Sequence, residues 1–275
     1  MSTHTQTLWS RIFSTDHKVI GMQYLCTGLV MSLVGGFLAY AFRMQLAWPG
    51  SSVPLLGQMD SAQYNVFVTM HGSIMIFWVA MPVLLAAFGN LLIPLMVGAD
   101  DMAFPTLNMM SYWTFLFSAI LIIISFFVPG GAFGGGWTAY PPLSANGYPE
   151  TIDFLGTMGG NLWIVAVFIE FVAFLMGGIN FIVTTFNLRA PGLTWYRLPI
   201  TVWMLLIASL DFMFSVGPLI AGAIMLLFDR TIGTGFFNPE AGGDPLLFQH
   251  MFWFFGHPEV YVLLLPALGF VTEVI

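Results

Sequence analysis

Long apolar stretches alternate with short polar ones along almost the whole chain. Most of these stretches have about twenty residues or more, the length of α-helix that crosses a hydrocarbon core about 30 Å thick. The pattern predicts six transmembrane helices, at residues 19–42, 65–96, 113–128, 161–186, 200–228 and 246–275. No charged run or flexible linker divides them, so residues 1–275 are predicted to form one domain, an all-α bundle embedded in a lipid membrane.

The composition supports this fold class. Of the 275 residues, 58% are hydrophobic and 7% are charged, whereas soluble domains carry about 25% charged residues. No basic stretch indicates binding to nucleic acid. The single cysteine, Cys26, excludes a disulfide within the chain and a cysteine-only metal cluster, and its apolar surroundings predict a small buried side chain.

Basic residues near the ends of the spans predict how the bundle is oriented. With the N-terminus on the inner side of the membrane, four of them fall on that side, as the positive-inside rule expects: Arg11, Lys18, Arg189 and Arg197. The same arrangement puts Asp101 on the inner side, and Arg43 and Arg230 toward the outer side.

The connection between the third and fourth spans is rich in glycine and reads P-G-G-A-F-G-G-G-W-T-A-Y-P-P-L, residues 129–143. It does not precede a soluble βαβ unit, which argues against nucleotide binding. Trp137 and Tyr140 are residue types that favour the membrane–water boundary, so the sequence predicts an ordered interfacial loop.

Ionisable side chains inside a membrane are costly and mark ligands or ion pathways. The predicted spans contain His71, Glu170, Asp211, His257, Glu259 and, near the end, Glu273. For His71 the sequence leaves two interpretations open. It is either a hydrogen-bonded structural histidine or an axial ligand of a haem, whose iron takes imidazole and whose flat ring fits an apolar slot.

The last span holds the densest chemistry, in F-F-G-H-P-E-V-Y at residues 254–261. His257 and Tyr261 are four residues apart, so on a helix they share a face, while Glu259 points elsewhere. Pro258 removes one backbone N–H and disturbs the turn before it. An imidazole beside a phenol, with a buried carboxylic acid on a second face, is typical of a site that moves protons and electrons.

These residues are part of a series of motifs that resembles subunit I of the haem–copper oxidases, most of all that of cytochrome c oxidase. The motifs follow the family's order and cover nearly the whole chain: S-T-D-H-K-V-I-G (14–21), Y-N-V-F-V-T-M-H-G (64–72), F-G-N-L-L-I-P-L-M-V-G-A-D-D-M-A-F-P (88–105), G-W-T-A-Y-P-P-L (136–143), G-I-N-F (178–181) and G-G-D-P-L-L-F-Q-H-M-F-W-F-F-G-H-P-E-V-Y (242–261). The resemblance implies the front half of a twelve-helix fold.

The resemblance also implies two haems, of the haem A type, and a copper ion called Cu-B. His71 would be one axial ligand of the low-spin haem. Arg43 would contact the formyl group of that haem, and Trp137 would lie near one of its propionates.

For the copper, the resemblance assigns roles on the last span. His257 would be a ligand of Cu-B, and Tyr261 would be covalently linked to that histidine. Trp253 would stack beside the copper histidine. Glu259 would be the proton-transferring carboxylic acid near the two-metal centre.

A proton pathway is implied as well. Asp101 would open it from the inner side, and three asparagines would line it: Asn90, Asn108 and Asn180. Where many family members then carry a pair of serines, this sequence has Ala173 and Phe174. Glu170 and Asp211 are additional carboxylates, and we expect them either to make polar contacts with other helices or subunits, or to provide an altered water route.

The family's remaining metal ligands have no counterpart among the five histidines of this sequence. His4 and His17 precede the first span, and His250 is expected to be structural. We therefore expect that the C-terminal half of subunit I, in the same protein or in another chain, is needed to complete the metal centre.

The function that these features predict is that of a respiratory terminal oxidase, which reduces dioxygen to water with electrons from cytochrome c and pumps protons. A quinol oxidase of the same superfamily is the nearest alternative. From other classes, a proton-conducting transporter and a non-catalytic fragment stay open, and a visible haem spectrum would distinguish them from an oxidase.

The resemblance implies as partners a copper-bearing subunit II, a subunit III and cytochrome c as the electron donor. The expected location is the inner (plasma) membrane of a bacterial cell, with the mitochondrial inner membrane as the alternative.

Overall fold

The computed structural model describes residues 9, 12–54, 56–145 and 158–275. Six helical segments within them are long and apolar enough to cross a membrane, which confirms the predicted fold class. They are α2 (His17–Ala47), a composite second span (Ser61–Val97), α5 (Pro105–Ile124), α6 (Met158–Asn187), α7 (Ile200–Thr231) and α8 (Pro245–Val274). The composite span consists of α3 (Ser61–Ser73), the π-helical segments η1 (Ile74–Ala80) and η2 (Pro82–Ala87), and α4 (Phe88–Val97). Short 3₁₀ turns, η3 (Trp195–Arg197) and η4 (Pro239–Ala241), lie in the connections.

Five of the predicted spans agree with the observed helices to within a few residues, but the start of the third is wrong. We predicted residues 113–128, whereas α5 runs from Pro105 to Ile124. Pro105 occupies the first turn, where its missing N–H costs nothing. The polar residues that follow, Asn108 and Ser111, lowered the apparent hydrophobicity, yet both are fully buried against other helices.

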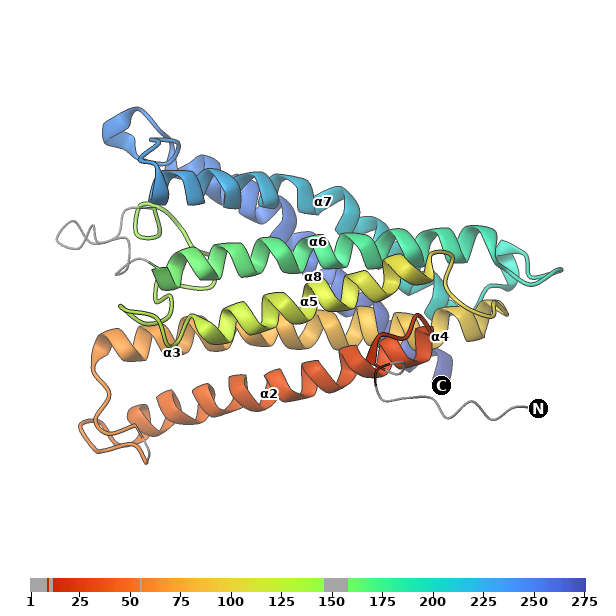
Figure 1. Cartoon of the computed structure of the whole chain (residues 1–275), viewed down its shortest axis with the longest axis horizontal. Coiled ribbons are helices and arrows are strands. Elements are labelled where there is room, and N and C mark those ends of the chain that lie inside the picture. Colours follow the sequence, from red (N-terminus) through yellow and green to blue (C-terminus); the bar gives the residue numbers. More distant parts are fainter. Residues whose placement is uncertain (1–8, 10–11, 55, 146–157) are drawn as a thin grey trace.

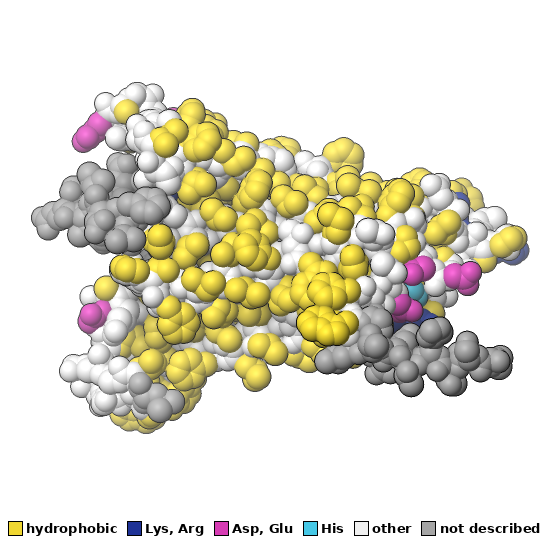
Figure 2. All heavy atoms as spheres, in the orientation of Figure 1, with side chains coloured by type: hydrophobic (Ala, Val, Ile, Leu, Met, Phe, Trp, Pro, Cys, Tyr) yellow, Lys and Arg dark blue, Asp and Glu magenta, His cyan; other side chains and the backbone are white. Residues whose placement is uncertain are grey.

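The spanning helices lie side by side along the long axis, so consecutive spans run in opposite directions (Figure 1). The start of α2 and the end of α8 therefore lie at the same end of the bundle, which we call the inner end. Figure 2 shows hydrophobic side chains along the body of the bundle and charged side chains at its ends. Lys18, Arg189, Arg197 and Asp101 belong to the inner end, and Arg43 and Arg230 to the opposite end, as the sequence predicted. Arg11 and His4 lie outside the described residues.

Side-chain caps set where two of the helices begin. The Asp16 carboxylate accepts hydrogen bonds from the backbone N–H groups of Lys18 and Val19, at 2.8 and 3.2 Å, and caps α2. Asp60 and Gln63 form a reciprocal capping box at the start of α3. We placed His17 before the first span, whereas it is the first residue of α2. Its side chain is buried, and its Nδ1 donates a hydrogen bond to the Asn90 carbonyl at 2.6 Å.

Small residues on one side of α2 allow it to approach the second span closely. A Cβ atom added at Gly35 would lie 2.7 Å from the Met75 sulfur, so a larger residue there would have to displace the Met75 side chain. Such small-residue contacts are common between membrane helices because apolar packing alone gives no preference over lipid. Cys26 lies on another side of α2 and is exposed, so its predicted burial is wrong. Other residues of the same apolar run, such as Tyr24 and Met31, do face the core.

A second close contact, between α4 and α6, generates a prediction. A Cβ atom at Gly89 would lie 2.6 Å from Cε2 of the buried Phe181 ring. We expect Gly89→Ala to push the helices apart and to lower stability by about 1–3 kcal/mol, the usual cost of overpacking. Thermal unfolding of the purified membrane protein measures this. Gly36→Ala is the matched control, since nothing lies within 4 Å of its added Cβ; equal melting temperatures for the two variants would contradict the prediction.

Candidate functional site

His71 lies in the last turn of α3, just before the π-helical segments. Its Nδ1 is 2.9 Å from the Gly35 carbonyl oxygen of α2. A carbonyl can only accept, so Nδ1 carries the hydrogen and Nε2 keeps its lone pair. The edge of the Phe42 ring meets the imidazole at a centroid distance of 5.5 Å. These contacts fix the ring orientation and leave Nε2 as a ligand for a metal such as haem iron.

Arg43 is near this histidine but does not form part of its contacts. It follows Phe42 on α2 and has an exposed side chain at the outer end of the bundle. Its predicted contact with a haem formyl group stays a prediction.

The glycine-rich loop joins the His71 region to α8. The Gly136 N–H donates to the Thr69 hydroxyl at 2.9 Å, and the Trp137 ring lies 3.5 Å from where a Cβ at Gly72 would be. On its other side Trp137 meets Phe252 and Trp253, at centroid distances of 5.5 and 6.1 Å. The predicted ordered loop is confirmed. It packs against the bundle, as the buried Ala139 shows, and its position at the membrane–water boundary stays a prediction.

Helix α8 separates its chemical groups onto two faces, as the four-residue spacing predicted. The rings of His257 and Tyr261 meet edge to face, with centroids 4.7 Å apart and planes at 75°. Both side chains are exposed on the surface of this chain. Glu259 points inward and is only 3% exposed. The imidazole and the phenol are thus in contact on the exposed face of α8, which we call its open face. The carboxyl group is buried on the opposite face.

The open face of α8 continues over most of its length. Residues three or four positions apart are exposed along it: His250, Trp253, His257, Tyr261, Leu264 and Leu268. Trp253 is one turn before His257, and its N–H donates to the Tyr140 hydroxyl. In the part of the chain that the structure describes, no group of three His, Cys, Asp or Glu residues could hold a metal ion. A copper ion at His257 would therefore need ligands from beyond these residues.

The predicted asparagines form a connected polar cluster near the inner end. The Asn108 side-chain N–H donates to the Asn90 side-chain oxygen at 2.5 Å, and both residues are buried. Asn180 on α6 accepts from the Phe104 N–H at 2.9 Å and donates to the Phe104 carbonyl at 2.8 Å. Asp101, in the same loop and partly exposed, accepts from the Met102 N–H at 2.7 Å. The structure thus brings Asp101 and the three asparagines to one end of the bundle.

Two hydroxyl groups extend this cluster toward the middle of the bundle, and the sequence analysis missed both. The Tyr24 hydroxyl donates to Ser111 at 3.0 Å, and Ser111 donates to the Asn108 carbonyl at 2.7 Å. Ser111 follows Asn108 by three positions, so a shared helix face was a usable signal for it. The sequence offered no comparable indication for Tyr24, because an aromatic residue in an apolar span is normally predicted to pack in the core.

The two additional carboxylates occupy different environments. Glu170 is 0% exposed, and neither of its carboxyl oxygens has a hydrogen-bond partner. We expected Glu170 to make a polar contact with another helix or subunit, and this expectation is wrong. Among the described residues, its carboxyl oxygens have no hydrogen-bond partner on another helix, and the side chain is not exposed to another subunit. Asp211 on α7 is half-buried and interacts electrostatically with His257.

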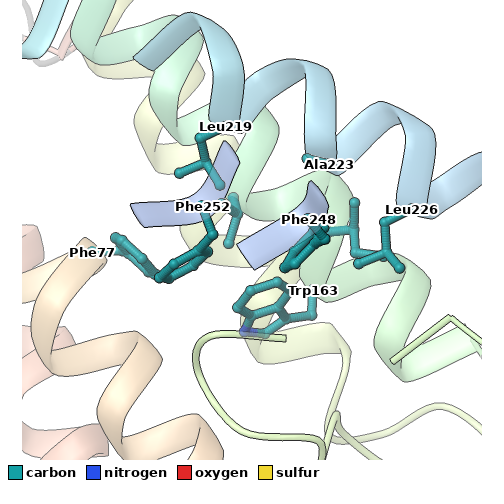
Figure 3. A pocket seen from close by; sticks show the side chains of 9 residues that line it. Phe77, Trp163, Leu219, Ala223, Leu226, Phe248 and Phe252 are labelled. Carbon is teal, nitrogen blue, oxygen red and sulfur yellow. The ribbon is translucent and has the colours of Figure 1, made fainter. Parts of the chain in front are cut away.

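A narrow cavity lies between α6, α7, α8 and η1 (Figure 3). It is lined by apolar and aromatic side chains, with Phe252 and Phe77 at one side and Ala223 and Leu226 at the other. The one N–H of its lining, Trp163 Nε1, is already donated to Ser73 at 2.9 Å. The lining of this cavity therefore offers no free side-chain donor or acceptor to an ion.

Known proteins are similar to this sequence over almost its full length. The chain is 43% identical to an alternative cytochrome c oxidase subunit 1 of Bradyrhizobium diazoefficiens, over 99% of this chain and 46% of the relative. It is 42% identical to cytochrome c oxidase subunit 1 of Thermostichus vulcanus, over 96% of this chain and 45% of that protein. A heme-copper oxidase subunit I+III of Aeropyrum pernix is 44% identical over 96% of this chain and 31% of the relative. The chain spans about half the length, or less, of these relatives.

The family model described as cytochrome c and quinol oxidase polypeptide I matches residues 19–275. This match begins within α2 and includes every spanning helix described above, with His71, His257, Glu259 and the asparagine cluster. The chain belongs to the family of cytochrome c and quinol oxidase polypeptide I.

Proposed function

We propose that this chain is part of the catalytic subunit of a respiratory terminal oxidase, which reduces dioxygen to water with electrons from cytochrome c and pumps protons. The observation that carries the proposal is the division of α8. His257 and Tyr261 are in contact on its open face, while Glu259 is buried on another. A metal-binding imidazole, a phenol and a dry carboxyl group within two turns suit a reaction that consumes both electrons and protons.

Membership of the family implies haem and copper, and the side chains present fit them. His71 offers Nε2 to a haem iron, because Gly35 holds its Nδ1–H. His257 would be one copper ligand, with Tyr261 linked to it and Trp253 beside it. Arg43 would contact the formyl group of a haem A, and Trp137 would lie near a propionate. When bound, the haems and the copper supply the redox chemistry, and the protein supplies ligation, protons and dryness.

Protons would enter at Asp101 and move along the cluster of Asn90, Asn108 and Asn180 toward Glu259. Asparagine side chains donate and accept but do not ionise, so they can order water without trapping charge. The burial of Asn90 and Asn108 suits this role. Glu259 would hold a proton in a dry environment, where a carboxyl group with no partner avoids charge.

The rest of the assembly follows from the same proposal. The open face of α8 would be covered by the remaining helices of subunit I, which would also bring the other metal ligands. A copper-bearing subunit II and a subunit III would complete the complex, and one relative is named as a fusion of subunits I and III. Six spanning segments place the chain in a membrane; we propose the inner membrane of a bacterial cell.

A quinol oxidase is the second candidate, because the family description includes both electron donors. The relatives from Bradyrhizobium and Thermostichus are both named for cytochrome c. Turnover of the purified complex with reduced cytochrome c, compared with turnover on a quinol, decides between the two.

A reduced-minus-oxidised visible spectrum of the purified complex tests the oxidase itself, with and without carbon monoxide and with copper analysis. We expect two haem signals, one of which shifts with carbon monoxide, and bound copper. His71→Ala should lose the low-spin haem signal, and His257→Ala should lose copper and oxygen consumption. His250→Ala is the matched control, since it lies on the same face of α8 two turns earlier and should change neither signal. A complex without haem or copper would reopen the transporter and fragment hypotheses.

The loop that carries Asp101 gives a further prediction. Asn180→Ala removes both hydrogen bonds to the Phe104 backbone. Since such buried bonds are worth about 1–3 kcal/mol, amide hydrogen exchange in residues 98–104 should accelerate about tenfold or more. Oxygen consumption should fall while the haem spectrum stays intact. Asn187→Ala, at the exposed end of the same helix, should leave both unchanged. Normal exchange in Asn180→Ala would show that this side chain does not hold the loop.

A further inference from the structure

Glu170 is the least expected polar group in the bundle. It lies in the middle of α6, is 0% exposed, and has no hydrogen-bond partner at either carboxyl oxygen. A carboxyl group in such a place costs several kcal/mol of stability if it is charged, and it pairs with nothing that would compensate. A purely structural role would require a partner, and none is present among the residues that the structure describes.

The surroundings of Glu170 connect it to polar groups on two sides. Toward the inner end, Phe174 follows it by one turn and packs against the Tyr24 ring at a centroid distance of 6.4 Å. The Tyr24 hydroxyl is at the end of the hydrogen-bonded series through Ser111 to Asn108. Tyr24 and Glu170 lie close enough to interact electrostatically.

Toward α8, the neighbouring residue Phe171 packs against Phe255 at 4.9 Å. Phe255 precedes Glu259 by one turn. The contact between Phe171 and Phe255 therefore joins α6 and α8 close to the positions of Glu170 and Glu259. The Glu170 and Glu259 carboxyl groups also interact electrostatically. Glu170 therefore stands between the hydroxyl pair of Tyr24 and Ser111 and the inward face of α8.

The sequence of α6 explains why a relay is needed at this place. Between Glu170 and Asn180 the helix has no polar side chain, and the ten-residue separation corresponds to about 15 Å along its axis. Ala173 and Phe174 are both buried there, and the Phe174 ring fills space against Phe115 and Phe212, at 6.1 and 6.0 Å. This segment cannot order a continuous row of water through its own side chains.

We propose that Glu170 is a second buried proton-carrying carboxylic acid, which links the hydroxyl pair of Tyr24 and Ser111 to the side of the bundle on which Glu259 lies. The inference rests on the proposed function as an oxidase and deepens it. Each proton comes from water at the inner surface. When the Glu170 O–H gives its proton to a water on the side of α8, its carboxylate accepts another proton from water ordered beside the Tyr24 hydroxyl, and that water is reprotonated from the inner surface. Glu170 thus ends each cycle protonated, and no electron is transferred.

The test uses the purified, full oxidase complex reconstituted in vesicles. Glu170→Gln keeps the shape of the side chain but cannot carry a proton, so oxygen consumption should fall about 100-fold, the usual scale of a lost proton-transfer group. The haem spectrum and copper content should remain those of the unmodified complex. Glu170→Asp, which keeps a carboxyl group, should recover a large part of the rate. Glu273→Gln is the control, since this carboxyl group only accepts from the Thr201 N–H at the inner end of α8 and glutamine can do the same.

Infrared difference spectra measure whether the carboxyl group changes with the redox state of the enzyme. If Glu170 only filled space, no carboxyl band in these spectra would depend on it. Reduced-minus-oxidised spectra should contain a protonated carboxyl band that disappears in Glu170→Gln and shifts in Glu170→Asp. If Glu170→Gln does not assemble, the shifted band and the altered rate in Glu170→Asp still decide the matter. Unchanged turnover and unchanged carboxyl bands in the Glu170 variants would overturn this inference and leave the oxidase proposal standing. A complex that lacks haem and oxygen consumption before any substitution would instead overturn the proposed function.

Discussion

The interior of this bundle is closely packed, and most of its buried polar side chains find their hydrogen-bond partners within the protein. Several of these hydrogen bonds join helices. Trp78 donates to Ser118 at 3.0 Å and ties the second span to α5, and Trp163 donates to Ser73 and ties α6 to α3. These pairs hold the helices in register where apolar packing alone would allow them to slide. Glu170 and Glu259 differ from these pairs, because neither carboxyl oxygen of either residue has a hydrogen-bond partner within the described part of the same interior.

Helix α8 shows how the same constraint organises the site. Its inward face is apolar except for Glu259, and Phe252 and Phe255 on that face pack against the rest of the bundle. Its open face carries His257 and Tyr261, together with large apolar side chains that are 43–49% exposed, such as Trp253 and Leu264. The imidazole and the phenol are thus separated from the carboxyl group by the thickness of one helix. The separation follows from positions alone, since 257 and 261 are one turn apart and 259 lies half a turn away.

Sequence periodicity was sufficient to predict the number of spans, the two ends of the bundle and the pairing of His257 with Tyr261. It failed where a polar residue in a span faces the interior. The start of α5 was misplaced because Asn108 and Ser111 resemble an extramembrane segment until their partners on α4 and α2 are known. His17 was missed for the same reason, since only the fold shows the Asn90 carbonyl that its ring contacts. The predicted burial of Cys26 was wrong because exposed and buried positions of α2 are both apolar, so composition does not distinguish them.

Glu170 and Asp211 show what the fold adds to a sequence that contains both. In the sequence the two are alike, each a single carboxylate in an apolar span. In the structure Asp211 is partly exposed and lies near a histidine, so surroundings outside this chain can solvate it. Glu170 has no exposed surface through which it could be solvated. The rings of Phe174 and Phe171 pack on either side of it, against Tyr24 and against Phe255 of α8. A group sealed in this way contributes nothing to packing that an apolar side chain of similar size would not do better. A proton that it holds and passes on gives this buried carboxyl group a role that packing does not.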